Sequence, residues 1–135
     1  MFVTRAGRHD KADLKDFIEK LTRTEVDIGQ GTAMIAREGV IIGCIRLLEV
    51  EPGTLVFDDV LVAEGRDQSI AKQLVQAALN NKGGTVYARV SQSDAALFDD
   101  FGFAPIDPHE APDGVTAYWD SRPSPAESPT HLRAR

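Results

Sequence analysis

The sequence predicts a mixed α/β fold, in which helices cover a sheet of antiparallel and parallel strands. Two strand-like runs, residues 32–37 and 40–50, follow one another through the tight turn Glu38-Gly39, which is typical of an antiparallel hairpin. An apolar run at residues 54–62 then leads through a polar turn into a helical pattern at residues 70–79. Such a strand, turn and helix begin a β-α-β crossover, which joins parallel strands.

The N-terminal segment predicts one strand and one helix. Residues 1–4 form a short apolar run, and Asp10 and Asp13 stand where the N-cap and first turn of a helix favour acids. Apolar residues follow at positions i, i+3, i+4 and i+7 and give this helix one buried face: Leu14, Phe17, Ile18 and Leu21.

The middle of the chain predicts the centre of the sheet. Residues 40–50 are nearly all apolar, which indicates a strand that is buried on both faces. Pro52-Gly53 turns the chain into the next strand, residues 54–62. The helix that follows ends at Lys82-Gly83-Gly84.

The C-terminal part predicts a strand at residues 85–90, a third helix that ends at Gly102, and a last strand at residues 115–119. The order is therefore β-α-β-β-β-α-β-α-β. Where the sheet changes from antiparallel to parallel, we expect its central strands to splay and to open a crevice for a ligand. We expect one domain over residues 1–120, and a disordered tail rich in Pro, Ser and Arg over residues 121–135.

Composition restricts the function. A net charge of −6 argues against a general nucleic-acid binder, which would show a basic face. The single cysteine, Cys44, excludes an intrachain disulfide and a cysteine-based zinc site, and three scattered histidines predict no metal site. Neither a membrane span nor a signal peptide is recognisable, so we expect no membrane partner and a cytoplasmic location.

The turn at residues 66–71 is the most informative feature, because N–H groups at a helix N-terminus bind phosphate well. It resembles the acyl-CoA-binding signature of the GNAT N-acetyltransferases: Arg or Gln, two residues, Gly, one residue, then Gly or Ala. Arg66, Ser69 and Ala71 stand at these positions. Residues 96–103 resemble the end of the fourth helix of that family, and the resemblance covers residues 1–119.

The resemblance implies a GNAT-like fold with acetyl-CoA as acyl donor and a primary amine, of a small molecule or a protein, as acceptor. The pantetheine arm would lie along the fourth strand, and the diphosphate would lie on the amides of the turn. The binding residues that it implies are Val60, Leu61, Val62, Arg66, Asp67, Gln68, Ser69, Ile70, Ala71 and Phe98. The sequence leaves the oligomeric state open, a homodimer included.

The sequence departs from the family pattern at several positions. Asp67 stands where the family usually has Gly, and a carboxylate repels a diphosphate. Ser69 replaces the central Gly, which would allow a closer approach of the ligand. The connection from Val62 to Arg66 is about one residue shorter than is common and lacks the usual proline. Phe98 replaces a frequent Tyr that often protonates the leaving thiolate, so transfer would proceed without that acid.

Two consecutive acids on the fourth strand, Asp58 and Asp59, are the candidates for the catalytic base that takes the proton of the amine. Neighbouring strand residues face opposite sides of a sheet, so one of the two faces the side of the cleft. The alternative is that they are solvated or salt-bridged. Tyr87 could replace the missing acid or pack in the core, and His109 could be a base or an ordinary loop residue.

Two functions follow as hypotheses. The first is an acyl-CoA-dependent N-acetyltransferase in which the amine attacks the thioester directly. The second is a non-catalytic module of the same fold that binds acetyl-CoA or a partner protein, which the missing Tyr and the altered turn favour. A tRNA-acetylating toxin of this fold is disfavoured by the acidic net charge.

Overall fold

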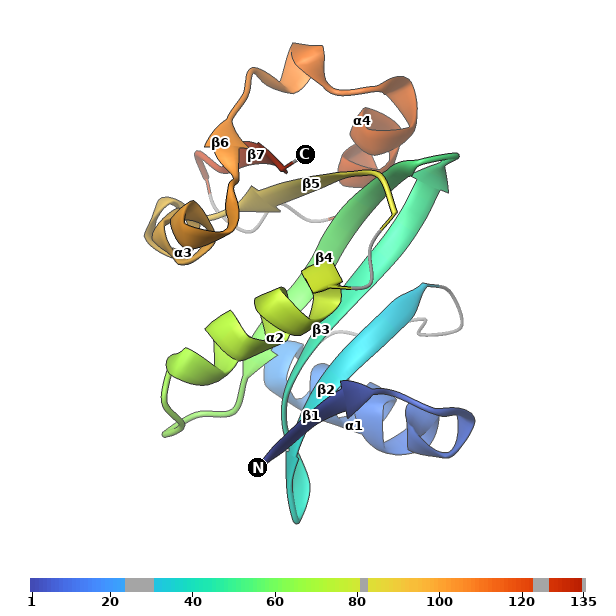
Figure 1. Cartoon of the computed structure of the whole chain (residues 1–135), viewed down its shortest axis with the longest axis vertical. Coiled ribbons are helices and arrows are strands. Elements are labelled where there is room, and N and C mark those ends of the chain that lie inside the picture. Colours follow the sequence, from blue (N-terminus) through green and yellow to red (C-terminus); the bar gives the residue numbers. More distant parts are fainter. Residues whose placement is uncertain (24–30, 81–82, 123–126, 135) are drawn as a thin grey trace. The chain divides into compact units, whose positions relative to one another are not determined.

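The computed structural model describes residues 1–23, 31–80, 83–122 and 127–134 (Figure 1). It divides into two compact units: unit 1 comprises Met1–Leu47 and Asp58–Lys82, and unit 2 comprises Leu48–Phe57 and Gly83–Arg135. The elements are β1 (Phe2–Arg5), α1 (Lys11–Thr22), β2 (Thr32–Glu38), β3 (Val40–Glu51), β4 (Thr54–Val62), α2 (Ser69–Asn80), β5 (Thr85–Val90), α3 (Gln92–Phe98), β6 (Ala104–Pro105), α4 (Asp113–Asp120) and β7 (Thr130–Ala134). Short 3-10 turns lie at Arg8–Asp10, Asp99–Phe101 and Pro108–Glu110.

Unit 1 contains the first part of the sheet, with the strand order β1-β2-β3-β4. Both β1 and β3 pair with β2 in antiparallel register, and a bulge interrupts the β2–β3 ladder between Ala36 and Arg37. Gly39 closes this hairpin with φ = 77°, a backbone conformation that glycine adopts without strain. The hairpin predicted at Glu38-Gly39 is therefore confirmed.

The two helices of unit 1 cover opposite faces of its strands (Figure 1). On one face Leu14 and Ile18 of α1 pack in a buried cluster with Ile35 and Cys44. Gly43 faces the other helix: a Cβ there would lie 3.1 Å from Leu74 Cδ1 of α2 and from the Leu61 carbonyl oxygen of β4. The glycine thus lets α2 approach the sheet closely, which sets the position of the turn before α2.

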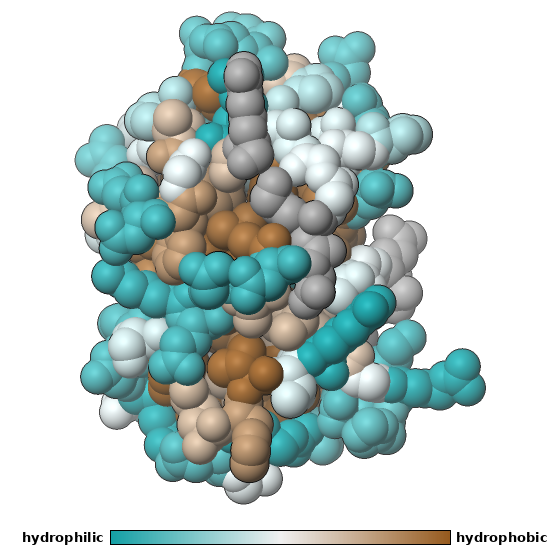
Figure 2. Space-filling model, viewed as in Figure 1, coloured by the Kyte–Doolittle hydropathy of each residue, from teal (hydrophilic) through white to brown (hydrophobic). Residues whose placement is uncertain are grey.

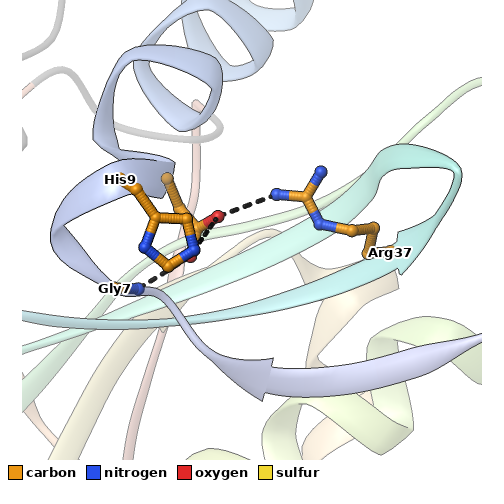
Figure 3. Close-up of polar contacts among 4 residues, drawn as sticks. Gly7, His9 and Arg37 are labelled. Carbon is orange, nitrogen blue, oxygen red and sulfur yellow. Dashed lines mark hydrogen bonds and ion pairs between the residues drawn. The ribbon is translucent and has the colours of Figure 1, made fainter.

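A buried carboxylate joins the start of α1 to β2 (Figure 3). Asp10 accepts hydrogen bonds from the Gly7 N–H at 2.8 Å and from Arg37 Nη2 at 2.9 Å, and His9 Nε2 lies 3.5 Å away. These donors stabilise the ionised form, chiefly through the backbone bond from Gly7, and lower the pKa of Asp10. Asp10 stands at the N-cap position of α1, as predicted, but its side chain makes no cap bond to that helix; it binds the local Gly7 N–H and reaches Arg37 on β2.

Unit 2 contains the second part of the sheet, with the order β4-β5-β7-β6. The β4–β5 pair is parallel, as the crossover predicts, and β7 pairs antiparallel with β5 and with β6. Gly84 precedes β5 at φ = 125°, and a Cβ there would lie 2.1 Å from the Gly53 carbonyl oxygen. The same oxygen accepts the Thr85 N–H, so only glycine fits this junction without backbone movement.

The prediction of a strand at residues 115–119 is wrong, because this segment lies in helix α4. Val115 and Trp119 are both buried and stand four residues apart, which is the helical spacing of one apolar face. The N-terminus of α4 receives a tertiary cap: the Gly114 N–H donates to Glu51 Oε1 at 2.6 Å. Because this acceptor comes from β3, 63 residues earlier, the local sequence pattern could not reveal it.

The prediction of a disordered tail is wrong for residues 130–134, because these residues form β7. Leu132 and Ala134 each retain 2% of their exposure, and Leu132 pairs with Ala88 of β5 and Pro105 of β6. The segment alternates partly buried and buried residues, and its prolines and serines lie before the strand. The sheet of unit 2 thus includes a strand from beyond the predicted domain boundary at residue 120.

The face shown in Figure 2 is largely hydrophilic, with apolar side chains in separate patches. Among the described residues the exposed large apolar side chains are Met1, Phe2 and Val40. None of the described helices is long and apolar enough to cross a membrane.

Candidate functional site: the turn before α2 and strand β4

The predicted phosphate-binding turn lies on the surface of unit 1. It leaves β4 after Val62 and enters α2 at Ser69, and residues 64–69 are all exposed. Gly65 adopts φ = 79°, and no atom lies within 4 Å of the place where its Cβ would be. A ligand can therefore approach the backbone of this turn without meeting side chains at Gly65.

The turn already uses part of its donor set. Ser69 N–H donates to Asp67 Oδ1 at 2.8 Å, while the N–H groups of Ile70 and Ala71 donate to the carbonyls of Asp67 and Gln68 at 3.1 and 3.0 Å. The hydrogen bonds from the Ser69 backbone and side chain stabilise the carboxylate and lower the pKa of Asp67. Within the described part of the chain, the N–H groups of Asp67 and Gln68 have no acceptor. Two amides are thus available to an anion, and a third becomes available if Asp67 swings away.

Arg66, the predicted phosphate partner, forms an ion pair with Glu38. Its Nη1 lies 3.0 Å from Glu38 Oε1, at the end of β2, and both side chains are substantially exposed. Exposed ion pairs contribute little and are screened by salt, so a phosphate could replace Glu38 at small cost.

Strand β4 offers a free edge at the predicted pantetheine segment. The β4–β5 ladder comprises Thr54–Thr85, Leu55–Val86 and Val56–Tyr87, and no further pair forms among the described residues. Val60, Leu61 and Val62 follow this ladder and are partly buried. The parallel pairing therefore ends at Val56, six residues before the end of β4.

The two predicted base candidates have different outcomes. Asp58 Oδ2 accepts a hydrogen bond from Arg46 Nη2 of β3 at 2.8 Å, and its side chain retains 15% exposure. Asp59 lies in β4, but its side chain is outside the described residues. Arg46 was not predicted. The signal was present, however, since an arginine inside an apolar central strand requires a carboxylate on a neighbouring strand.

Phe98 lies in the core of unit 2. It retains 1% exposure and packs on Phe57 and Phe103, with ring centroids 6.1 and 5.1 Å away. The Phe98 side chain thus packs α3 against the sheet of unit 2. The predicted contact of Phe98 with the cofactor stays a prediction.

The other aromatic and histidine candidates lie in unit 2. Tyr87 is buried and meets Trp119 edge-on at 6.5 Å, and the buried Trp119 Nε1 has no hydrogen-bond partner among the described residues. The ring of His131 packs against that of Trp119 at a tilt, with centroids 5.0 Å apart, and burial, followed by the charge of Arg89, lowers the pKa of His131. His109 is exposed in the 3-10 turn Pro108–Glu110.

A cavity of about 650 Å³ lies in unit 1 beside the start of the turn. Its wall includes Arg37, which Asp10 holds in place (Figure 3). Its rim carries both signs of charge, so it selects neither a cation nor an anion. The lining residues are Asp13, Asp16, Phe17, Lys20, Leu21, Arg23, Arg37, Gly39, Val40, Ile41, Ala63 and Glu64. No group of three or more His, Cys, Asp or Glu among the described residues could hold a metal ion.

Neither a protein-family profile nor a curated protein matches the chain. Solved structures do match it. An acyl-CoA N-acyltransferase from Pseudomonas aeruginosa superposes with a TM-score of 0.70 at 16% identity, over 100% of both chains. Escherichia coli ElaA gives 0.71 at 14% identity, also over 100% of both chains.

A third structure, N-acetylglutamate synthase from Neisseria gonorrhoeae in complex with coenzyme A and N-acetyl-glutamate, gives 0.69 at 17% identity. That match covers 100% of this chain and 35% of the synthase. A GNAT-family acetyltransferase from Staphylococcus aureus gives 0.69 at 16% identity, over 98% of this chain and 97% of that one. The chain therefore has the fold of the GNAT acyl-CoA N-acyltransferases.

Proposed function

We propose that this protein is a divergent GNAT enzyme that transfers an acyl group, in the first instance acetyl, from coenzyme A to a primary amine. The proposal is supported chiefly by one continuous segment, in which the free edge of β4 is followed by an exposed turn and then by the N-terminus of α2. The edge suits the amides of a pantetheine arm, and the turn suits a diphosphate.

The residues present fit this donor. The free N–H groups of Asp67 and Gln68 would bind phosphate oxygens, and Arg66 would exchange Glu38 for a phosphate. Val60, Leu61 and Val62 would pair with the pantetheine arm, and Ser69, Ile70 and Ala71 would form the helix end behind the diphosphate. Bound acyl-CoA supplies an acyl carbon activated as a thioester, which the amine nitrogen attacks as the carbon–sulfur bond breaks.

The protein's own task in the reaction is to take the amine's proton. A carboxylate of β4, Asp58 or Asp59, would accept it directly or through water. The buried Phe98 cannot protonate the departing sulfur. A thiolate whose conjugate acid resembles a free cysteine, with a pKa of about 8.5, leaves without that help at a lower rate.

The acceptor would be an amine on a small molecule or on a protein. The net charge of −6 favours a basic acceptor through long-range attraction. The alternative function is a module that binds acyl-CoA without transferring the acyl group, and the carboxylate cap on Ser69 favours it, because this cap occupies one donor of the turn.

Incubation with acetyl-CoA and a panel of amines, followed by detection of free thiol, tests the proposal. Release above the uncatalysed rate that depends on both the protein and the amine supports transfer. If acetyl-CoA raises the melting temperature but no amine releases thiol, the binding module is the correct function. If acetyl-CoA neither stabilises the protein nor reacts, both proposals are wrong.

A further inference from the structure

The cavity of unit 1 is a second candidate site, separate from the proposed coenzyme A site. Its volume of about 650 Å³ lies within the range of small-molecule sites, about 300–1,000 Å³. Three segments line it: helix α1, the end of the β2–β3 hairpin, and residues 63–64 after β4. None of the lining residues belongs to the segments proposed above for coenzyme A. A ligand in the cavity would therefore use contacts that the acyl donor does not need.

Three of the charged side chains on this lining have their counterions within the protein. Lys20 Nζ lies 3.0 Å from Asp16 Oδ2 on the same helix. Arg37 Nη2 lies 2.9 Å from Asp10 Oδ1, which comes from the turn before α1. These pairs neutralise one another, so the charges that select a ligand are the remaining ones.

The remaining charged side chains on the lining are Asp13, Arg23 and Glu64. All three are exposed, and their side chains have no ion pair or hydrogen bond within the part of the chain that the structure describes. Two carboxylates and one guanidinium therefore face the cavity without a counterion. This set is complementary to a ligand that carries both an ammonium and a carboxylate.

Apolar side chains separate the two free charges of α1. Asp13 lies in the first turn of this helix and Arg23 at its C-cap, and ten residues of helix correspond to about 15 Å. Between them Phe17 and Leu21 line the same cavity, one helical turn apart. The hairpin adds Val40, which is 67% exposed and is one of the three exposed large apolar side chains described. The ligand should therefore have an apolar body between its two charged ends.

We propose that this cavity binds a short peptide with apolar side chains, whose ammonium lies toward Asp13 and whose terminal carboxylate pairs with Arg23. A free amino acid is too short for both contacts, because its ammonium and carboxylate share one carbon. An extended peptide spans about 3.3–3.6 Å per residue, so three or four residues cover about 10–14 Å. Glu64 adds a second carboxylate, so the ammonium is held more strongly than the terminal carboxylate.

Calorimetry with trileucine and its blocked forms tests the ligand chemistry. We expect trileucine to bind more tightly than its N-acetyl form, which lacks the ammonium, and than its C-terminal amide, which lacks the carboxylate. Each block should weaken binding by roughly threefold to tenfold, the scale of an exposed charged contact. Triglycine, which lacks the apolar side chains, and free leucine, which is too short, should both bind more weakly than trileucine.

Substitutions in α1 test which residue holds which end of the peptide. Arg23→Gln should weaken binding of trileucine but leave binding of its C-terminal amide unchanged, because the amide has no carboxylate to lose. Asp13→Asn should likewise weaken binding of trileucine more than binding of the N-acetyl form. The matched controls are Arg8→Gln and Glu19→Gln, which replace charges outside the cavity lining and should change neither affinity.

The outcomes decide the proposal without reference to acyl transfer, because the assay contains no coenzyme A. Equal affinity for free and blocked trileucine overturns it, as does an equal loss for trileucine and its amide in Arg23→Gln. Absence of binding by every peptide at millimolar concentration also overturns it. Asp13 and Arg23 are exposed, so both variants should keep the melting temperature of the wild type, which confirms that a loss of binding is local.

Discussion

Substitution of Leu132 by Ala tests whether the C-terminal segment is part of the fold. Leu132 lies in the middle of β7, retains 2% exposure and pairs with Ala88 and Pro105 on the two neighbouring strands. Ser128 lies just before this strand and is exposed, so Ser128→Ala is the matched control. A free tail would tolerate both changes equally.

The expected loss of stability follows from the burial of the leucine. Truncation of a fully buried leucine to alanine costs about 2–5 kcal/mol, because apolar burial is lost and a cavity remains. Unfolding entropies of about 2.1 cal/mol/K per residue give about 0.28 kcal/mol/K for 135 residues. A loss of about 3 kcal/mol therefore lowers the melting temperature by about 10 °C. Ser128→Ala should shift it by less than about 2 °C, since exposed substitutions lie within about 0.5 kcal/mol.

Tryptophan fluorescence is the suitable assay. Trp119 is the single tryptophan of the chain, it belongs to unit 2, and its ring lies 5.0 Å from that of His131 in β7. Its emission therefore reports the unit that contains β7. Equal melting temperatures for Leu132→Ala and Ser128→Ala would show that β7 does not pack in the sheet and would refute the reasoning.

Three further predictions follow from single contacts. Asp67→Gly frees the Ser69 N–H and removes a negative charge from the turn, so calorimetry should show that coenzyme A binds several-fold more tightly. Pantetheine lacks the diphosphate and should bind with unchanged affinity, and equal gains for both ligands would contradict a diphosphate site at this turn. Gly84→Ala should destabilise unit 2 far more than Gly83→Ala, because a Cβ at Gly84 would collide with a carbonyl at 2.1 Å and one at Gly83 meets nothing within 4 Å; urea denaturation of both variants checks this. The lowered pKa of His131 means that protonation favours the unfolded chain, so its contribution to stability is present above pH about 6.5 and is lost as the pH falls through its lower folded value. Unfolding of His131→Asn should therefore depend less on pH between 7.5 and 5 than unfolding of the wild type, and parallel pH profiles would argue against a partly buried, neutral imidazole.

The sequence predicted those features that short-range patterns encode. The β2–β3 hairpin needs only Gly39 between two apolar runs, and α1 needs only apolar residues at helical spacing. The turn before α2 could be located because an apolar strand, a polar turn and a helix follow one another directly. The resemblance to a known signature also predicted the fold, which the matching solved structures confirm, whereas the ligand of the turn stays a proposal.

The features that the sequence did not predict depend on partners that are distant along the chain. Helix α4 is capped by Glu51, 63 residues earlier, and an apolar segment without a cap in its own sequence predicts a strand instead of a helix. A short strand such as β7 is hardly stable alone and forms because β5 and β6 exchange backbone hydrogen bonds with it.

The site shows the same division. Residue types and order by themselves determined that a helix N-terminus follows β4 and that two acids stand on that strand. Only the tertiary structure decided that Glu38 holds Arg66 and that Arg46 is buried against Asp58. The physical reason is that the state of a charged side chain depends on which opposite charge the fold brings within about 3 Å and on how much water the fold removes, and neither quantity is local in the sequence.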